Sequence, residues 1–90
     1  MYNHEVIPYL QKILNRLSKK DKSAYGQVLK KIEEIINSPD VEHYKNLRYD
    51  MKEYKRVHIG SFVLVFKFDK ASNLIKFEDF DHHDVIYKKK

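Results

Sequence analysis

The stretch that decides the fold reads YKRVHIGSFVLVFKF and spans residues 54–68. Apolar side chains recur at every second position on both sides of Gly60 and Ser61, and a period of two is the pattern of β-strands. Gly60 and Ser61 have the composition of a tight turn, so we predict two antiparallel strands, residues 54–59 and 62–68, joined there. Both faces of the second strand are apolar, which is typical of a strand in the middle of a sheet.

A third strand follows directly. Residues 69–73 have the composition of a turn. Residues 74–80 then alternate between apolar and charged side chains, as a strand with one buried face does. The three strands are therefore expected to form an antiparallel meander.

Two helices precede the strands. Residues 9–17 repeat apolar side chains at i, i+3, i+4 and i+7, and a longer stripe of the same period runs over residues 25–36 until a proline ends it. Ser18, with Asp21 three residues later, resembles a capping box at the start of the second helix. Residues 18–20 are expected to join the two helices into an antiparallel hairpin.

Together these elements predict an α+β fold in which the helical hairpin covers one face of a small antiparallel sheet. Ninety residues, 42% of them hydrophobic, suffice for one domain, residues 1–90, with a single modest core. Segment 2–7 is either a short edge strand or the lead-in to the first helix. The remaining stretches are a polar connection at 40–53, a polar, His-rich tail at 81–87 and a frayed end at 88–90.

Charge and composition narrow the function. The chain has 18 Lys and Arg against 13 Asp and Glu, a net charge of +5, which favours nucleic acid as the partner. The absence of cysteine excludes disulfides, thiolate catalysis and cysteine-ligated metals. The longest apolar run, residues 62–66, is far shorter than the roughly 20 residues of a membrane-spanning helix, and residues 1–5 lack the features of a signal peptide. We expect a cytoplasmic protein with no membrane partner.

The strand over residues 54–59 carries the first candidates for chemistry. Arg56 and His58 are two residues apart, so their side chains share a face, which we expect to be exposed to solvent. Near neutral pH an imidazole can accept or donate a proton, which suits RNA cleavage. Further basic or aromatic candidates are Lys45, Arg48, Lys52, Lys55, His82, His83 and Tyr87. Such a surface suits single-stranded RNA, and it equally fits the ordinary solvated charges of a basic protein.

The adjacent histidines His82 and His83, with three aspartates nearby, raise the question of a metal. Neighbouring residues of an extended tail point in opposite directions, so these two side chains are not expected to share an ion. No HExxH-type spacing occurs either. We expect no metal site and no cofactor.

Beyond these patterns, the whole chain resembles the RelE toxins of the RelE/ParE superfamily, which belong to type II toxin–antitoxin modules. The resemblance rests on four segments: IINSP at 35–39, LR at 47–48, YKRVHIGSF at 54–62, and DHHDVIY at 81–87. The last is similar to the family's terminal His-Arg-x-x-x-Tyr pattern. The short length and divergent ending look more like an archaeal member than an enterobacterial one.

The resemblance implies a ribosome-dependent mRNA endonuclease that acts in the A site without a metal, using the 2′-hydroxyl as the internal nucleophile. By motif position, Arg56 and His58 match the family's two basic residues on the first long strand, with Lys55 as the alternate. His83 falls where the family carries an arginine, and Tyr87 matches the terminal tyrosine. The implied partners are the ribosome, mRNA and a RelB-like antitoxin that wraps the toxin in a hetero-oligomer.

One position departs from the family pattern. The family's common arginine after the aromatic residue of the second strand is Val63 here. A bidentate phosphate clamp is therefore missing. This departure keeps two alternatives open, a ParE-like poison of DNA gyrase and a noncatalytic rRNA-binding inhibitor of translation.

Overall fold

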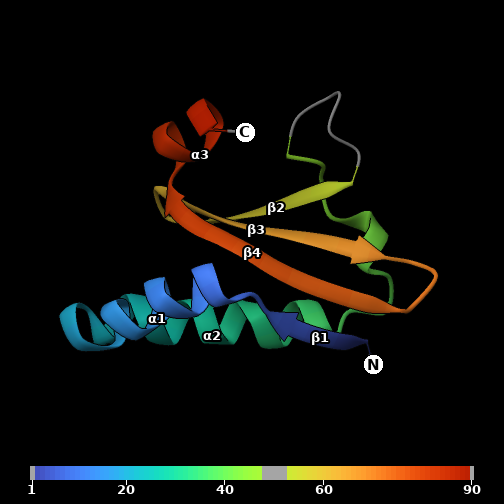
Figure 1. Ribbon diagram of the computed structural model, residues 1–90, viewed down its shortest axis with the longest axis horizontal. Coiled ribbons are helices and arrows are strands. Elements are labelled where there is room, and N and C mark those ends of the chain that lie inside the picture. Colours follow the sequence, from blue (N-terminus) through green and yellow to red (C-terminus); the bar gives the residue numbers. More distant parts are fainter. Residues whose placement is uncertain (1, 48–52, 90) are drawn as a thin grey trace.

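The structure is a computed structural model, and it describes residues 2–47 and 53–89 (Figure 1). Its elements are β1 (Asn3–Val6), α1 (Pro8–Lys20), α2 (Lys22–Ile36), a 3-10 turn η1 (Val41–His43), β2 (Tyr54–Ile59), β3 (Phe62–Asp69), β4 (Leu74–His82) and α3 (His83–Lys89). The strands form one four-stranded sheet in the order β1-β4-β3-β2. Helices α1 and α2 cover one face, while α3 lies on the other side of the sheet (Figure 1). The predicted α+β architecture is confirmed.

The meander is as predicted. β2 and β3 pair antiparallel from Tyr54 with Lys67 to Ile59 with Phe62, and β3 pairs antiparallel with β4. β3 is therefore a central strand, in agreement with its two apolar faces. Gly60 has φ +61°, a left-handed conformation that glycine adopts without steric cost, and it allows the tight turn between the strands.

Two alternatives were open for residues 2–7, an edge strand or a lead-in to the first helix, and the structure confirms the edge strand. β1 pairs parallel with the first half of β4, so the sheet is mixed rather than purely antiparallel. The amide of Ile7 extends this pairing by donating to the carbonyl of Phe77 at 3.1 Å. The chain then turns into α1, where Pro8 occupies the first helical turn, a position that needs no backbone donor.

β4 is two residues longer than predicted and carries an irregularity. Val65 faces Asp79 and the next residue, Phe66, faces Phe77, so β4 holds one extra residue, Glu78, at this point. This β-bulge reverses the alternation of side chains along the rest of the strand. Asp79 consequently points away from α1 and α2, and its side chain is buried.

The helix junction corrects the predicted capping box. Ser18 lies within α1, where its hydroxyl donates to the carbonyl of Asn15 at 2.7 Å. Asp21 alone separates the helices and is the N-cap of α2, because its carboxylate accepts from the amide of Ala24 at 3.0 Å. An aspartate at the N-cap satisfies a backbone donor that the helix leaves free, so the position three residues after Ser18 holds the cap itself.

We predict that Asp21→Ala lowers the free energy of unfolding by about 1 kcal/mol, within the 0.5–2 kcal/mol range of lost N-caps. Ser18→Ala is the matched control, because its hydroxyl bonds only within α1, and its effect should stay within about 0.5 kcal/mol. Urea unfolding followed by circular dichroism measures both. A larger loss for Ser18→Ala than for Asp21→Ala would contradict the assignment of the cap.

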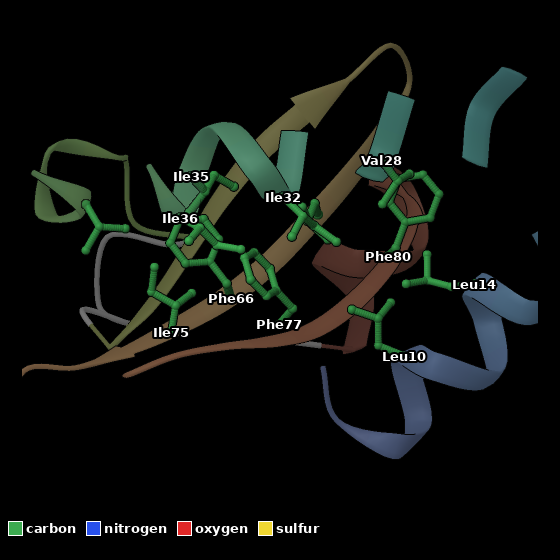
Figure 2. Close-up of a cluster of buried hydrophobic side chains, with 12 residues drawn as sticks. Leu10, Leu14, Val28, Ile32, Ile35, Ile36, Phe66, Ile75, Phe77 and Phe80 are labelled. Atoms are coloured by element: carbon green, nitrogen blue, oxygen red, sulfur yellow. The ribbon is translucent and has the colours of Figure 1, made fainter. Parts of the chain in front are cut away.

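The main core lies between the helical hairpin and the sheet. Figure 2 shows Phe66 and Phe77 of the central strands pointing toward Ile32 and Ile35 of α2, with Leu10 of α1 beside them. Phe66 and Phe77 are fully buried, and their ring centroids are 5.9 Å apart. The buried residues of this cluster are Leu10, Leu14, Val28, Ile32, Ile35, Ile36, Val41, Leu64, Phe66, Ile75, Phe77 and Phe80.

The C-terminal tail was expected to be extended after the last strand, and this expectation is wrong. Asp81 and His82 belong to β4, and residues 83–89 form α3. Ile86 explains the helix, because its side chain is fully buried against the sheet. Tertiary burial stabilises a seven-residue helix that would not form alone. Among the described residues, no helix has the length and apolar character needed to cross a membrane.

Candidate functional site

The sheet face opposite α1 and α2, which we call the open face, carries a second, smaller apolar cluster. Val63 and Val65 of β3 are fully buried there under Ile86 of α3, with Leu47 from the connection before β2. Tyr54 and Tyr87 pack at the margin of this cluster. The open face is therefore partly covered by α3, and the candidate residues on it lie beside a buried apolar cluster.

Arg56 and His58 project from β2 onto the open face, as their spacing predicted. Arg56 is opposite Val65 and His58 is opposite Val63. His58 is exposed, whereas Arg56 is half-buried, so the expectation of a solvent face holds for His58 and fails in part for Arg56. Tyr87 reaches the same face from α3 through its contact with the apolar cluster.

Arg56 has an unusual environment. Its Nε atom is buried and has no hydrogen-bond partner within residues 2–47 and 53–89. A buried donor without a partner costs free energy, and such groups in folded proteins call for an explanation. The guanidinium is the side chain best suited to bind phosphate through two parallel hydrogen bonds.

His83 lies at the end of the sheet, where β4 passes into α3. Its amide donates to the carbonyl of Ser61 at 3.0 Å, which anchors the start of α3 to the turn between β2 and β3. The imidazole of His83 is stacked on that of His82, with 4.5 Å between the ring centroids. The expectation that these neighbours point in opposite directions is wrong, because the chain changes from strand to helix between them.

Lys55 is placed differently from the other candidates. It shares the helix-covered face with Val57 and Ile59, is only 9% exposed, and sits opposite the buried Phe66. Its Nζ donates to the carbonyl oxygens of Glu42 at 3.2 Å and Tyr44 at 3.0 Å, and it lies 3.3 Å from Asn46 Oδ1. The ammonium thus ties the η1 segment to β2, and this arrangement argues against the RNA contact expected for it.

We predict that Lys55→Met lowers the free energy of unfolding by about 1–3 kcal/mol, because the carbonyl acceptors of the η1 segment lose a charged donor. Lys45→Met is the matched control, since the side chain of Lys45 is exposed, and its effect should stay within about 0.5 kcal/mol. Thermal and urea unfolding measure both variants. Equal stability of the two variants would contradict a structural role for Lys55.

The remaining sequence candidates lie around the margin of the open face or beyond it. Lys45 is exposed beside the outer edge of β2, where its carbonyl accepts from the amide of Arg56 at 3.0 Å. His82 is the last residue of β4. Arg48 and Lys52 lie outside the described residues.

Two basic residues of the open face were not among the candidates. Lys67 pairs with Tyr54 across β2 and β3, and its Nζ lies 5.0 Å from the centroid of the Tyr54 ring. Lys76 is opposite Lys67 on β4. Both could have been found from the strict alternation of residues 62–68 and 74–80, which places them on the face of Arg56. Lys67 adds positive charge to the open face, whereas the Nζ of Lys76 lies 3.8 Å from the carboxylate of Glu5 on β1.

Comparison with known proteins identifies the family. A protein named RelE4 from Methanocaldococcus jannaschii is 55% identical over 91 residues, which cover 100% of this chain and 95% of the relative. The chain belongs to the RelE family of toxins. A second relative in sequence, an uncharacterized protein of Methanosarcina mazei, is 42% identical over 88 residues, covering 97% of this chain and 100% of the relative. No family model matches the chain.

The RelE fold is also found by structure. The crystal structure of the isolated E. coli RelE toxin superposes with a TM-score of 0.69 over 99% of this chain and 94% of that one, at 16% sequence identity. At this identity the likeness establishes a shared fold. The expected resemblance to RelE, and to an archaeal member in particular, is confirmed.

Val63, the position where the RelE pattern carries an arginine, is fully buried in the apolar cluster of the open face. It packs in the same cluster as Ile86, so an arginine at this position would have to displace α3 or bury its charge, at a cost of several kcal/mol. In this RelE-type protein the position therefore helps to hold α3 on the sheet.

Proposed function

We propose that this RelE-type toxin inhibits translation by cutting mRNA in the A site of the ribosome. The observation that carries the proposal is the open face, where the half-buried Arg56 and the exposed His58 lie two residues apart on β2. Tyr87 comes to the same face on α3. A phosphate-binding cation next to an imidazole is the arrangement that phosphodiester cleavage needs.

The reaction we propose uses the RNA as its own nucleophile. The 2′-oxygen attacks the adjacent phosphorus and loses its proton to a base on the toxin. The bond from phosphorus to the 5′-oxygen breaks, and that oxygen takes a proton from an acid. The products are a 2′,3′-cyclic phosphate and a 5′-hydroxyl end, so the step balances without a metal or a second substrate.

The candidate residues of the open face, together with His83 at the end of the sheet, divide these tasks. Arg56 binds the phosphate and stabilises the charge of the pentavalent transition state through charge-assisted hydrogen bonds. His58 and His83 are the acid and the base, in one order or the other, because imidazole exchanges protons near neutral pH. Tyr87 stacks on a base of the mRNA or positions the 2′-hydroxyl.

A RelB-like antitoxin in the cytoplasm would hold the toxin in its resting state. A groove of about 410 Å³ between α1 and the start of β3 fits such a partner. Tyr9 and Phe62 line it and are 53% and 40% exposed, while Arg16 and Lys20 add positive charge. An amphipathic helix with acidic residues matches both properties. Co-expression with the neighbouring reading frame should yield a stable hetero-oligomer.

The test of the proposal is cleavage on the ribosome. Purified, antitoxin-free protein is incubated with ribosomes that carry a defined mRNA and an empty A site, and primer extension maps new 5′ ends. Cuts at the A-site codon that require the ribosome are the expected result. Intact mRNA from a preparation shown to be folded would overturn the endonuclease proposal.

The valine at position 63 favours the alternatives as second candidates, because the family's additional guanidinium is missing there. A gyrase poison of the ParE type would inhibit DNA supercoiling in vitro and leave mRNA intact. A noncatalytic inhibitor would bind ribosomes and stop translation without new 5′ ends. The same preparation should be put through all three assays.

A further inference from the structure

The junction of β4 and α3 gathers three side chains that can ligate a metal, His82, His83 and Asp84, which we call the His–His–Asp cluster. His83 Nδ1 lies 3.0 Å from Asp84 Oδ1, and His82 Nδ1 lies 3.6 Å from Asp84 Oδ2. One ligating atom from each residue can be chosen so that all three lie within 4.8 Å of one another. The proposed cleavage chemistry uses only His83 of the three.

These distances match the spacing of ligands around zinc. Zn–N and Zn–O bonds of about 2.0–2.1 Å at tetrahedral angles place neighbouring ligand atoms about 3.3 Å apart. The nitrogen-to-oxygen separations, 3.0 Å to Oδ1 and 3.6 Å to Oδ2, lie on either side of that value and end on different oxygens of the Asp84 carboxylate. An ion bound to both imidazoles therefore requires their rings to rotate out of the stacked arrangement.

The backbone around the cluster is held from two sides. His82 pairs with Phe62 across β3 and β4, and its ring meets that of Phe62 edge-on at 5.8 Å. The amide of His83 donates to the carbonyl of Ser61. A ligand set on restrained backbone loses little conformational entropy when it binds an ion.

The cluster is also accessible. The side chains of His82, His83 and Asp84 are 40%, 45% and 69% exposed, so an ion bound to them keeps a position open to water. Two imidazoles and one carboxylate favour a borderline transition metal over Mg²⁺ or Ca²⁺, which prefer oxygen ligands alone.

We propose that the His–His–Asp cluster binds one Zn²⁺ ion through the Nδ1 atoms of His82 and His83 and the carboxylate of Asp84. Binding replaces the hydrogen bond in which His82 Nδ1 accepts from the amide of Asp84 at 3.2 Å. It also replaces the contact between His83 and the carboxylate.

The consequence for activity rests on the proposed function. His83 is one of the two histidines proposed to move a proton. An imidazole whose Nδ1 is bound to zinc keeps its one proton on Nε2, so it can no longer take up the second proton that an acid or base in this reaction must exchange. Zinc therefore inhibits mRNA cleavage, and a chelator restores it. Asp84 contacts Nδ1 of His83, so the cleavage rate of Asp84→Asn without zinc serves as the reference for that variant. Relative to this rate, Asp84→Asn should lose the sensitivity to zinc.

Calorimetric titration with ZnCl₂ of the full chain, carrying no affinity tag, tests the binding directly. The wild type should bind one ion, and NMR should show the imidazole signals of His82 and His83 shifting. His82→Gln, His83→Gln and Asp84→Asn should each weaken binding by roughly 10- to 100-fold. His4→Gln, on β1, is the matched control and should leave the affinity unchanged.

Equal zinc affinity in the wild type and in His82→Gln/His83→Gln overturns the proposal, and so does loss of affinity in His4→Gln. Asp84→Asn changes one exposed side chain, so it keeps the test decisive if the double variant fails to fold. The binding measurement does not involve RNA. Zinc binding without mRNA cleavage would therefore refute the proposed function alone, and cleavage without zinc binding would refute the metal site alone.

Discussion

Cleavage of mRNA on the ribosome is expected to fall by about 10²- to 10⁴-fold when the histidine that moves a proton is replaced by alanine, the usual contribution of general acid–base catalysis. His58 and His83 are the two positions to change. His58 is exposed on the open face next to Arg56, and His83 is held at its end by the hydrogen bond to Ser61. The measurement is the single-turnover rate of A-site cleavage, followed by primer extension.

The pH dependence of that rate separates the two roles. A bell-shaped profile reports one group that must be deprotonated and one that must be protonated. Replacing the base should remove the fall of the rate at low pH, and replacing the acid should remove the fall at high pH. The two single variants should lose opposite limbs of the profile.

His4→Ala is the control for these variants. His4 is on β1, and its ring contacts Phe77 of the main core, on the opposite side of the sheet from Arg56 and His58. Its removal should leave the rate of cleavage within about twofold of the wild type, because it touches none of the proposed chemistry. If alanine at Arg56, His58, His83 and Tyr87 in turn costs less than tenfold in every case, the assignment of the site is wrong.

Phe66→Ala is expected to lower the free energy of unfolding by about 3–5 kcal/mol, the cost of truncating a buried phenylalanine. Phe66 is fully buried. The centroid of its ring lies 5.9 Å from that of Phe77 and 5.7 Å from that of Tyr44, which it meets edge-on. The loss combines the free energy of burying the ring, which the variant no longer gains, with the cost of the cavity left in the core. It is a large part of the 5–15 kcal/mol that stabilises a typical domain. Urea unfolding measures it.

Phe62→Ala is the matched control on the same strand. Phe62 is 40% exposed and stacks on Phe80 with 5.2 Å between ring centroids. Its truncation should cost below about 1.5 kcal/mol, the value of an aromatic pair at a partly solvated site. Similar losses for the two variants would mean that the main core does not centre on Phe66.

The strands and helices could be predicted because their patterns are local. The alternation over residues 54–68 places Val57 and Ile59 toward the core and Arg56 and His58 on the other face, and the structure agrees. The face to which a side chain on a strand points depends only on whether its position is odd or even. The faces can therefore be predicted by counting residues for as long as the strand is regular.

Counting residues no longer predicts the face of a side chain where a strand is irregular. The bulge at Glu78 shifts the alternation by one residue, so the buried position of Asp79 could not be derived by counting from Ile75. A bulge depends on how two strands pair over their whole length, and no short segment of either strand contains that information.

The same limit applies to Lys55 and to the tail. The parity of its position places Lys55 on the face of Val57 and Ile59, but only the fold brings the carbonyls of Glu42 and Tyr44 to its ammonium. The tail is polar, and it becomes helical because Ile86 packs against Val63 and Val65 of β3. Both outcomes require partners distant in sequence.

The sequence by itself determined the fold class, the central strand, the pair Arg56 and His58 on one face, and the resemblance to RelE, because periodicity and motif order are properties of the chain alone. The tertiary structure decided the burial of Arg56 and Lys55, the helix under Ile86 and the stacking of His82 on His83. Burial and side-chain partners arise only when distant segments pack together, since they depend on which surfaces lose water and which polar groups meet.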